Sequence, residues 1–234
     1  MGQISLVKNY LDKLFLSQVD GISFQVREKE YYESINKKKF LLSDDDYIYI
    51  SKLFKRTKKK LGIAIADIDK IDFFESINVD FYKIIRNDIT NMKLLNKILS
   101  TGKKVFISTG LSSDEDIKFF LDNFGNYRNF VLNHTQLSYD VKDCNLKAII
   151  SLREKYNVPV SFGSHCSNKN VIYMSLCFNP SDILFYVKLD NKINYPDDKH
   201  SVLLKNCISF TDNILKLRNA IGDGIKEEFK NKIK

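Results

Sequence analysis

Short apolar segments alternate with amphipathic segments along most of the chain, and this alternation limits the folds open to it. Each apolar segment is rich in β-branched or aromatic residues and nearly unbroken, which is typical of strands covered on both faces. Seven such segments occur, at 21–27, 62–67, 81–86, 104–109, 129–134, 158–163 and 182–188. Strands that alternate with helices predict a parallel β/α architecture.

The segments between the strands carry helix signals. Ser43 and Ser113 are each followed by acidic residues, which is the pattern of an N-cap with an acidic first turn. Gly125 is a stop signal after the second of these helices. We expect helices at 6–19, 47–61, 92–100, 117–124, 145–156 and 204–220.

The spacing of the strands favours a TIM-type (β/α) barrel. The last six strands start 19 to 29 residues apart, and a full barrel has eight strands in about 250 residues. A doubly wound open sheet is the alternative, but the sequence contains neither GxGxxG nor GxxxxGK[ST]. Because the chain opens with a helix, we expect an incomplete barrel of seven strands that lacks the first one, in a single domain over residues 1–234.

Composition argues against several classes of partner. Lys and Arg number 37 against 29 Asp and Glu, a net charge of +8. The lysines are scattered, so we interpret them as solvated surface residues and expect no nucleic acid partner. No apolar run approaches the ~20 residues that span a bilayer, and the N-terminus does not resemble a secretory signal. The four cysteines show no CxxC spacing, so we expect reduced thiols and a cytoplasmic protein without a membrane partner.

Polar residues gather where the predicted strands end. In a barrel, the carboxyl ends of the strands form the active site. The residues at or just after these ends are Gln25, Asp67, Lys83, Arg86, Asp88, Ser108, Thr109, Asn133, His134, Ser164, His165 and Lys188.

Two of the three histidines close neighbouring strands. His134 and His165 are 31 residues apart, so a parallel register would place them side by side at the mouth of the barrel. Two imidazoles so placed are able to share a divalent metal ion. The alternative, a hydrogen-bonded structural histidine, stays open for each. His200 follows a Pro-Asp-Asp-Lys segment, and we expect it to be exposed in a loop.

Other strand-end residues suit an anionic substrate. Lys83 and Arg86 are able to neutralise a phosphate or carboxylate, and Asp88 to accept a proton or orient a hydroxyl. Ser108 and Thr109 offer hydroxyls and backbone N–H groups before a helix start. Rim ion pairs and an ordinary strand-to-helix turn are the structural alternatives, and Gln25 also suits a half-buried structural amide.

Several segments at these positions resemble the sialic acid synthase family, in order from about residue 5 to 220. Residues 102–110 (GKKVFISTG) are similar to the family's GKPVILSTG, and residues 158–165 (VPVSFGSH) to VPVGYSDH. The other matching segments are 22–25 (ISFQ, similar to VKFQ), 42–46 (LSDDD, to LSEED), 81–91 (FYKIIRNDITN, to FKIASGDLTN), 134–139 (HTQLSY, to HCTSSY) and 196–201 (PDDKHS, to PDHKAS).

The resemblance implies a transferase reaction that joins phosphoenolpyruvate to an N-acetylated amino-sugar aldehyde, giving a nonulosonic 2-keto acid for surface glycans. It implies a divalent cation, Mn²⁺ or Mg²⁺, held by His134 and His165. Lys83 and Asp88 match catalytic positions of the family. The substrate-binding residues that we expect are Gln25, Arg86, Ser108, Thr109 and Tyr139.

Departures from the family keep a second interpretation open. The family's first strand ends in EIGxNH, which precedes the start of the resemblance, and we expect no counterpart of its C-terminal antifreeze-like domain. Ser23, Ala66 and Ser164 replace a Lys, a Thr and an Asp of the family. The alternative is a catalytically degenerate paralogue that serves as a scaffold or as a sugar- or metal-binding subunit. A missing strand leaves two sheet edges, so we expect the first helix or a homodimer to cover the gap, unless a partner chain or an upstream start supplies the strand.

Overall fold

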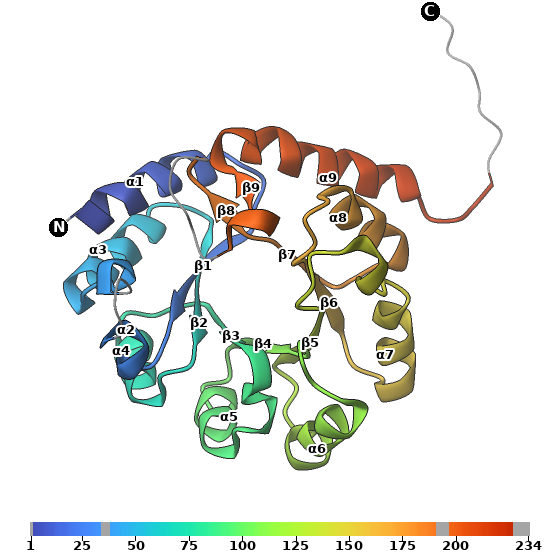
Figure 1. Ribbon diagram of the computed structural model, residues 1–234, viewed down its shortest axis with the longest axis horizontal. Helices are drawn as coiled ribbons and strands as arrows, with labels where there is room; N and C mark the ends of the chain where they lie inside the picture. Colours follow the sequence, from blue (N-terminus) through green and yellow to red (C-terminus); the bar gives the residue numbers. More distant parts are fainter. Residues whose placement is uncertain (1, 34–37, 191–196, 227–234) are drawn as a thin grey trace, which may run out of the picture.

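A computed structural model of the protein describes residues 2–33, 38–190 and 197–226. Within these ranges, seven parallel strands form one sheet, and their spatial order equals their order in the sequence. The sheet curls around a central lumen with the helices outside it (Figure 1). The predicted parallel β/α barrel with seven strands is confirmed. The strands are β1 (Gly21–Val26), β2 (Lys60–Ile65), β3 (Phe81–Ile84), β4 (Lys104–Ser108), β5 (Phe130–Thr135), β6 (Val160–Gly163) and β7 (Ile183–Leu184).

Helices connect the strands and cover the outer face of the sheet (Figure 1). All six predicted helices are present with shifted ends; the second ends early because residues 60 and 61 already belong to β2. None of the described helices is long and apolar enough to cross a lipid bilayer. The α-helices are α1 (Gly2–Leu14), α2 (Lys29–Glu33), α3 (Asp44–Phe54), α4 (Ile71–Ser76), α5 (Met92–Leu99), α6 (Asp114–Phe124), α7 (Ala148–Tyr156), α8 (Asn170–Ser175) and α9 (Cys207–Ile221).

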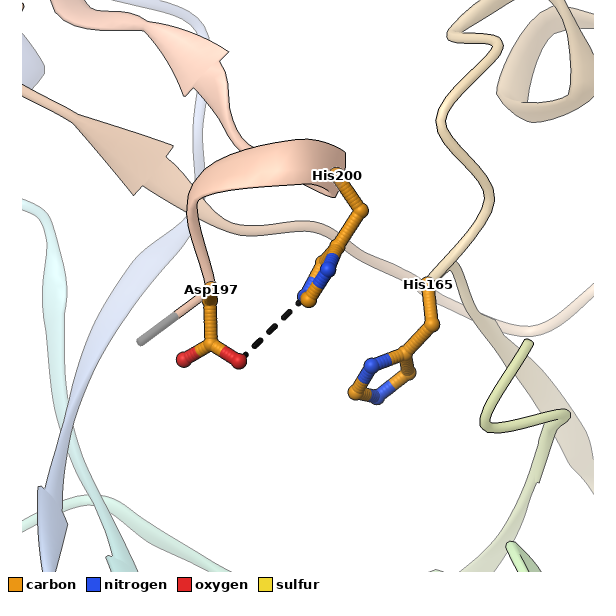
Figure 2. A group of neighbouring side chains, drawn as sticks. All are labelled: His165, Asp197 and His200. Carbon is orange, nitrogen blue, oxygen red and sulfur yellow. Dashed lines mark ion pairs between the residues drawn. The ribbon is translucent and has the colours of Figure 1, made fainter. Parts of the chain in front are cut away.

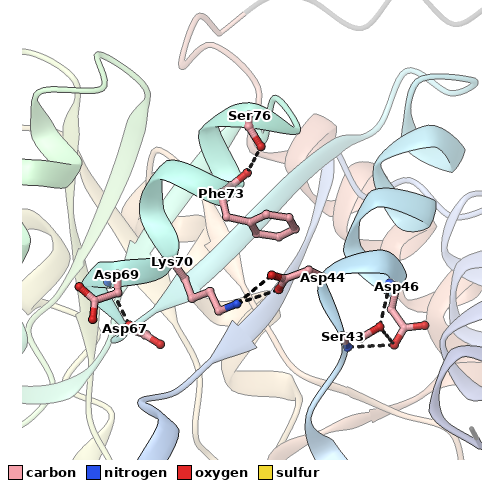
Figure 3. Close-up of polar contacts among 8 residues, drawn as sticks. All are labelled: Ser43, Asp44, Asp46, Asp67, Asp69, Lys70, Phe73 and Ser76. Carbon is pink, nitrogen blue, oxygen red and sulfur yellow. Dashed lines mark hydrogen bonds and ion pairs between the residues drawn. The ribbon is translucent and has the colours of Figure 1, made fainter.

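The predicted N-caps form capping boxes. The Ser43 hydroxyl accepts from the backbone N–H of Asp46 at 3.1 Å, and the Asp46 carboxylate accepts from the Ser43 N–H at 2.9 Å (Figure 3). The ammonium nitrogen of Lys70 forms an ion pair with the carboxylate of Asp44, in the first turn of the same helix, at 2.8 Å. Ser113 and Asp116 repeat the capping box before α6. Each box satisfies N–H groups that a helix start would otherwise leave unpaired.

The two faces of the sheet differ in chemistry because side chains alternate along a strand. Ile63, Tyr82 and Val105 are register neighbours on β2, β3 and β4, and all three belong to the buried apolar core. The positions between them, Ala64 and Lys83, face the lumen, where they line a cavity of about 960 Å³. The apolar layer under the helices therefore holds the fold together, and the lumen is free to carry polar chemistry.

The barrel is open between β1 and β7, which do not pair with each other. Outside this opening, α1 contacts α9 (Figure 1). The backbone N–H of Gln18, just after α1, donates to the hydroxyl of Thr211 on α9 at 3.1 Å. Of the covers expected for the gap, the structure thus shows the first helix, packed against the last one.

The run at 182–188, expected to be one strand, divides between two sheets. Its first part is β7, which pairs with β6, and its second part is β8 (Val187–Lys188), which pairs with β9 (Val202–Leu203). The carbonyl of Tyr186 accepts from the N–H of Val202 at 2.7 Å, which begins the second pairing. The run therefore contributes one strand to the barrel sheet and one to a separate two-stranded sheet.

Candidate functional site

The lumen of the barrel holds a buried lysine. Lys83 on β3 is only 8% exposed, and its register neighbours are Ala64 on β2 and Phe106 on β4. Its ammonium nitrogen lies 5.4 Å from the centre of the Tyr186 ring. A small neighbour on one side and aromatic rings nearby leave the amine facing the cavity. The lysine predicted to bind an anion therefore lies where a substrate in the lumen would meet it.

Three potential metal ligands converge at the mouth of the lumen (Figure 2). His165 follows β6, while Asp197 and His200 come from the segment around the 3₁₀ turn η6 (Asp198–His200). One ligand atom from each residue lies within 4.8 Å of the others. The Asp197 carboxylate oxygen Oδ1 is 3.5 Å from Nε2 of His200. Two loops that are remote in the sequence thus build one site.

Burial keeps both imidazoles of this group neutral. Burial, together with the nearby His200 and Lys83, lowers the pKa of His165 to about 3. Burial also lowers the pKa of His200 to about 4, with Lys169 and Lys83 adding to the effect. A neutral imidazole has a free lone pair, which is the form that ligates a metal ion.

The group fits a divalent cation. His200 is only 2% exposed, yet neither of its ring nitrogens has a hydrogen-bond partner among the described residues. An unsatisfied buried polar atom costs free energy, and a metal ion at this position would satisfy one of the two ring nitrogens. Imidazole nitrogen together with a carboxylate oxygen is a donor set that Mn²⁺ and similar ions accept.

Aromatic residues surround the group. The hydroxyl of Tyr186 lies 3.3 Å from Nε2 of His165, and the Tyr186 ring centre is 4.6 Å from that of His200. Tyr139, a predicted substrate-binding residue, stacks on His200 with ring centres 5.9 Å apart. These rings fix the orientation of both imidazoles.

His134 lies on the other face of the sheet. It is the register partner of Phe162 on β6. Both side chains point toward the buried apolar layer between the sheet and the helices. Its Nε2 donates to the carbonyl of Cys144 at 3.0 Å. Burial lowers its pKa as well. The structure therefore groups His165 with Asp197 and His200 rather than with His134, the residue predicted to share a metal ion with it.

The hydroxyls predicted to bind an anion are buried at the end of β4. Thr109 donates its hydroxyl to the carbonyl of Asn133 at 3.2 Å, and the Ser108 hydroxyl oxygen accepts from the N–H of Gly110 at 3.4 Å. The register pairs Ser108 with Asn133 on β5, on the lumen side. Of these two hydroxyls, that of Ser108 thus retains a proton to donate into the lumen.

The remaining predicted residues are Gln25, Asp88 and Arg86. Gln25 on β1 lines the cavity. Asp88 lies in the 3₁₀ turn η3 (Arg86–Thr90) that follows β3. The side chain of Arg86 is outside the described residues.

Sequence reasoning missed three residues of the site. His200 was expected to be exposed, and this was wrong: it is buried against His165 and Tyr186. Asp197 and His200 lie in the segment similar to PDHKAS, which was a usable signal. Tyr186 stands where the chain passes from β7 to β8, and its role depends on that bend, which the sequence pattern does not reveal.

Comparison with known proteins places the chain in a family. The family described as the NeuB family matches residues 7–226. An uncharacterized protein of Methanocaldococcus jannaschii is 28% identical over 242 residues, covering 96% of this chain and 70% of that protein. The N,N'-diacetyllegionaminic acid synthase of Campylobacter jejuni is 26% identical over 186 residues, covering 75% of this chain but 56% of the synthase.

A solved structure shares the fold. The N-acetylneuraminic acid synthetase of Leptospira borgpetersenii, in complex with citrate, superposes with a TM-score of 0.88 at 22% identity, covering 97% of this chain and 83% of that one. The resemblance seen in the sequence is thus confirmed over nearly the whole chain. The protein belongs to the NeuB family.

Proposed function

We propose that the protein joins phosphoenolpyruvate to an N-acetylated amino-sugar aldehyde and that water then displaces the phosphate, forming a nonulosonic 2-keto acid and inorganic phosphate for surface-glycan biosynthesis. The observation that carries this proposal is the convergence of His165, Asp197 and His200 at the mouth of a lumen that contains Lys83. The relatives whose names state an activity are synthases of sialic, legionaminic and pseudaminic acids, which supports this class of reaction.

The two imidazoles and the carboxylate would hold the divalent cation, Mn²⁺ or Mg²⁺. When bound, such an ion supplies Lewis-acid polarisation of the sugar aldehyde, which favours attack by the enol carbon of phosphoenolpyruvate. The chain keeps both imidazoles neutral by burial, so they are ready to ligate near pH 7. Tyr186 holds the ring of His165 from the side.

Lys83 would bind the anionic end of phosphoenolpyruvate. Its ammonium is buried in the lumen, and Coulomb attraction between opposite charges is stronger there than in bulk water. The Ser108 hydroxyl faces the same side of the sheet and offers a hydrogen bond to a phosphate or carboxylate oxygen. Gln25 and Tyr139 would contact the sugar, and Asp88 and Arg86 would complete the substrate site.

The degenerate paralogue is the second candidate, and particular residues favour it. Ser164 stands where the family has an Asp, and its buried hydroxyl has no partner among the described residues. Ser23 and Ala66 remove two further groups that the family uses. A scaffold or sugar-binding subunit would keep the barrel and the metal group without turnover.

The test is an assay of the purified protein with Mn²⁺, phosphoenolpyruvate and N-acetylmannosamine, read by phosphate release and by mass spectrometry of the 2-keto acid. We expect product that requires both substrates and the metal ion, and loss of product in Lys83→Met. Lys93→Met, at an exposed position on α5, is the matched control and should retain activity. Metal binding without any product from a panel of N-acetylated hexosamines would favour the scaffold instead.

A further inference from the structure

A second cavity of about 520 Å³ lies outside the lumen. It is bordered by the start of α8, the β8–β9 pair, the η6 turn and the first turns of α9, which are neighbours at one side of the barrel (Figure 1). None of its described lining residues also lines the cavity of the lumen. Nothing in the proposed condensation uses it.

The cavity is positively charged. Lys169, Lys188 and Lys199 line it, and Asp198 is the single carboxylate among its described lining residues. Asp198 pairs with the ammonium of Lys188 at 2.7 Å, and that lysine is 9% exposed. One of the three positive charges is therefore compensated, while two are not.

Among the described residues, the two remaining amines find only weak or neutral contacts. The ammonium of Lys169 donates to the carbonyls of Ser167 and Lys199, both at 3.3 Å. That of Lys199 lies 4.9 Å from the ring centre of Tyr139. Burial lowers the pKa of Lys169, and Lys188 adds to this effect. An anion with about two negative charges would match the uncompensated pair, because charge-assisted hydrogen bonds are the strong ones.

The rest of the lining suits a ligand ring that carries polar groups. The Tyr173 and Phe210 rings pack together with centres 5.2 Å apart, and Val202 and Leu203 extend this apolar wall. Amide side chains border the same cavity, and each offers both a donor and an acceptor; they are those of Asn170, Asn206 and Asn213. An apolar wall with a few polar groups is the usual lining of a small-molecule site.

We propose that this cavity binds a phosphomonoester of a sugar or nucleoside, with the phosphate at Lys169 and Lys199 and the ring against Tyr173 and Phe210. The proposal goes beyond the condensation and does not depend on it. The η6 turn contributes Asp198 and Lys199 to this cavity and His200 to the metal group, so the two sites share a segment of chain.

Isothermal titration of the full chain with AMP and with glucose 6-phosphate tests the proposal, with adenosine, glucose and inorganic phosphate as comparison ligands. We expect saturable binding of at least one ester, tighter than its uncharged counterpart and than inorganic phosphate. Asn213→Asp places a negative charge at the cavity wall and should weaken binding about tenfold or more. Asn219→Asp makes the same change farther along α9, away from the cavity, and should bind as the unaltered protein does.

Two further variants keep the result interpretable. Lys199→Gln should weaken ester binding while Lys205→Gln, at a neighbouring exposed position outside the cavity, should not. Lys83→Met in the lumen should leave ester binding unchanged, which separates this site from the proposed substrate site. Absence of saturable binding by either ester, equal affinity in Asn213→Asp and Asn219→Asp, or loss of binding in Lys83→Met would overturn the proposal.

Discussion

The imidazole rings of His165 and His200 lie 4.4 Å apart, centre to centre, although one follows β6 and the other follows β8. Both rings are buried enough to stay neutral near pH 7. The carboxylate of Asp197 completes the group from the η6 side. The site is thus made by two loops that the curled sheet brings together, which is how a barrel usually assembles its chemistry.

Tyr186 should act as a positioning residue for the metal group. Its hydroxyl is 3.3 Å from Nε2 of His165, and loss of such an outer contact typically reduces metal affinity by 10- to 100-fold. We expect Tyr186→Phe to weaken Mn²⁺ binding by about tenfold, as measured by calorimetry. Tyr127→Phe, in the segment before the amino end of β5, is the control. Unchanged affinity in Tyr186→Phe would remove Tyr186 from the site.

The metal-free protein should lose stability as the pH falls below about 6.5. Burial lowers the pKa of His134, and of His165 and His200 to about 3 and 4. An unfolded histidine titrates near 6.5, so between that pH and the folded pKa the unfolded state binds more protons and gains stability. The stabilisation is therefore complete above pH 6.5 and is lost toward pH 4.

Urea unfolding in the presence of a chelator measures this effect. We expect His165 and His200 each to contribute about 1–2 kcal/mol to the fall in unfolding free energy between pH 7 and pH 5, and His134 to add to the fall. His134→Gln keeps an N–H for the Cys144 carbonyl and does not titrate, so its unfolding free energy should fall less over this range. A variant with the same pH slope as the unaltered protein would show that His134 is not buried in its neutral form.

The cysteines should differ in reactivity. Burial raises the pKa of Cys144 to about 12 and that of Cys207 to about 11, whereas Cys177 is exposed. The thiolate is the form that reacts, and at pH 8 the raised pKa values leave little of it. We expect iodoacetamide to modify Cys177 first, with Cys144 and Cys207 protected, as read by peptide mass spectrometry. All should react in urea, and equal rates in the folded protein would contradict the burial.

The close approach of the Phe81 ring should require a glycine at position 62. A Cβ at this position would lie 2.2 Å from two atoms of the Phe81 ring, which packs edge-on against Phe106 with ring centres 5.7 Å apart. Gly62→Ala should lower the free energy of unfolding by about 1–3 kcal/mol. In a Phe81→Ala background, the same change should cost much less. An equal cost in both backgrounds would mean that the ring is not the obstacle.

Much of the fold was predictable because it depends on local patterns. The capping signals at Ser43 and Ser113 fixed two helix starts, and the apolar runs located the strands of the sheet. The prediction of one strand over 182–188 was wrong because the second half of this run pairs with β9, which lies farther along the chain. Periodicity cannot reveal which of two edges a short strand will join.

The site was predictable only in part, for a reason that concerns side-chain direction. Adjacent residues of a strand point to opposite faces, so Asn133 and His134 cannot both face the lumen, and the structure places Asn133 there beside Ser161. His165 was predicted as a metal ligand because it comes directly after the carboxyl end of its strand, where a barrel gathers its polar residues. His200 was judged by its polar neighbours in sequence, but its burial results from contacts with Tyr186 and His165 that only the fold creates.

The most direct test of the account is the Mn²⁺ affinity of the three histidine variants, measured by electron paramagnetic resonance of the free ion. The account predicts that His165→Gln and His200→Gln each lose about tenfold or more in affinity, while His134→Gln binds Mn²⁺ as the unaltered protein does. Strong binding in His200→Gln together with its loss in His134→Gln would contradict the ligand group of His165, Asp197 and His200.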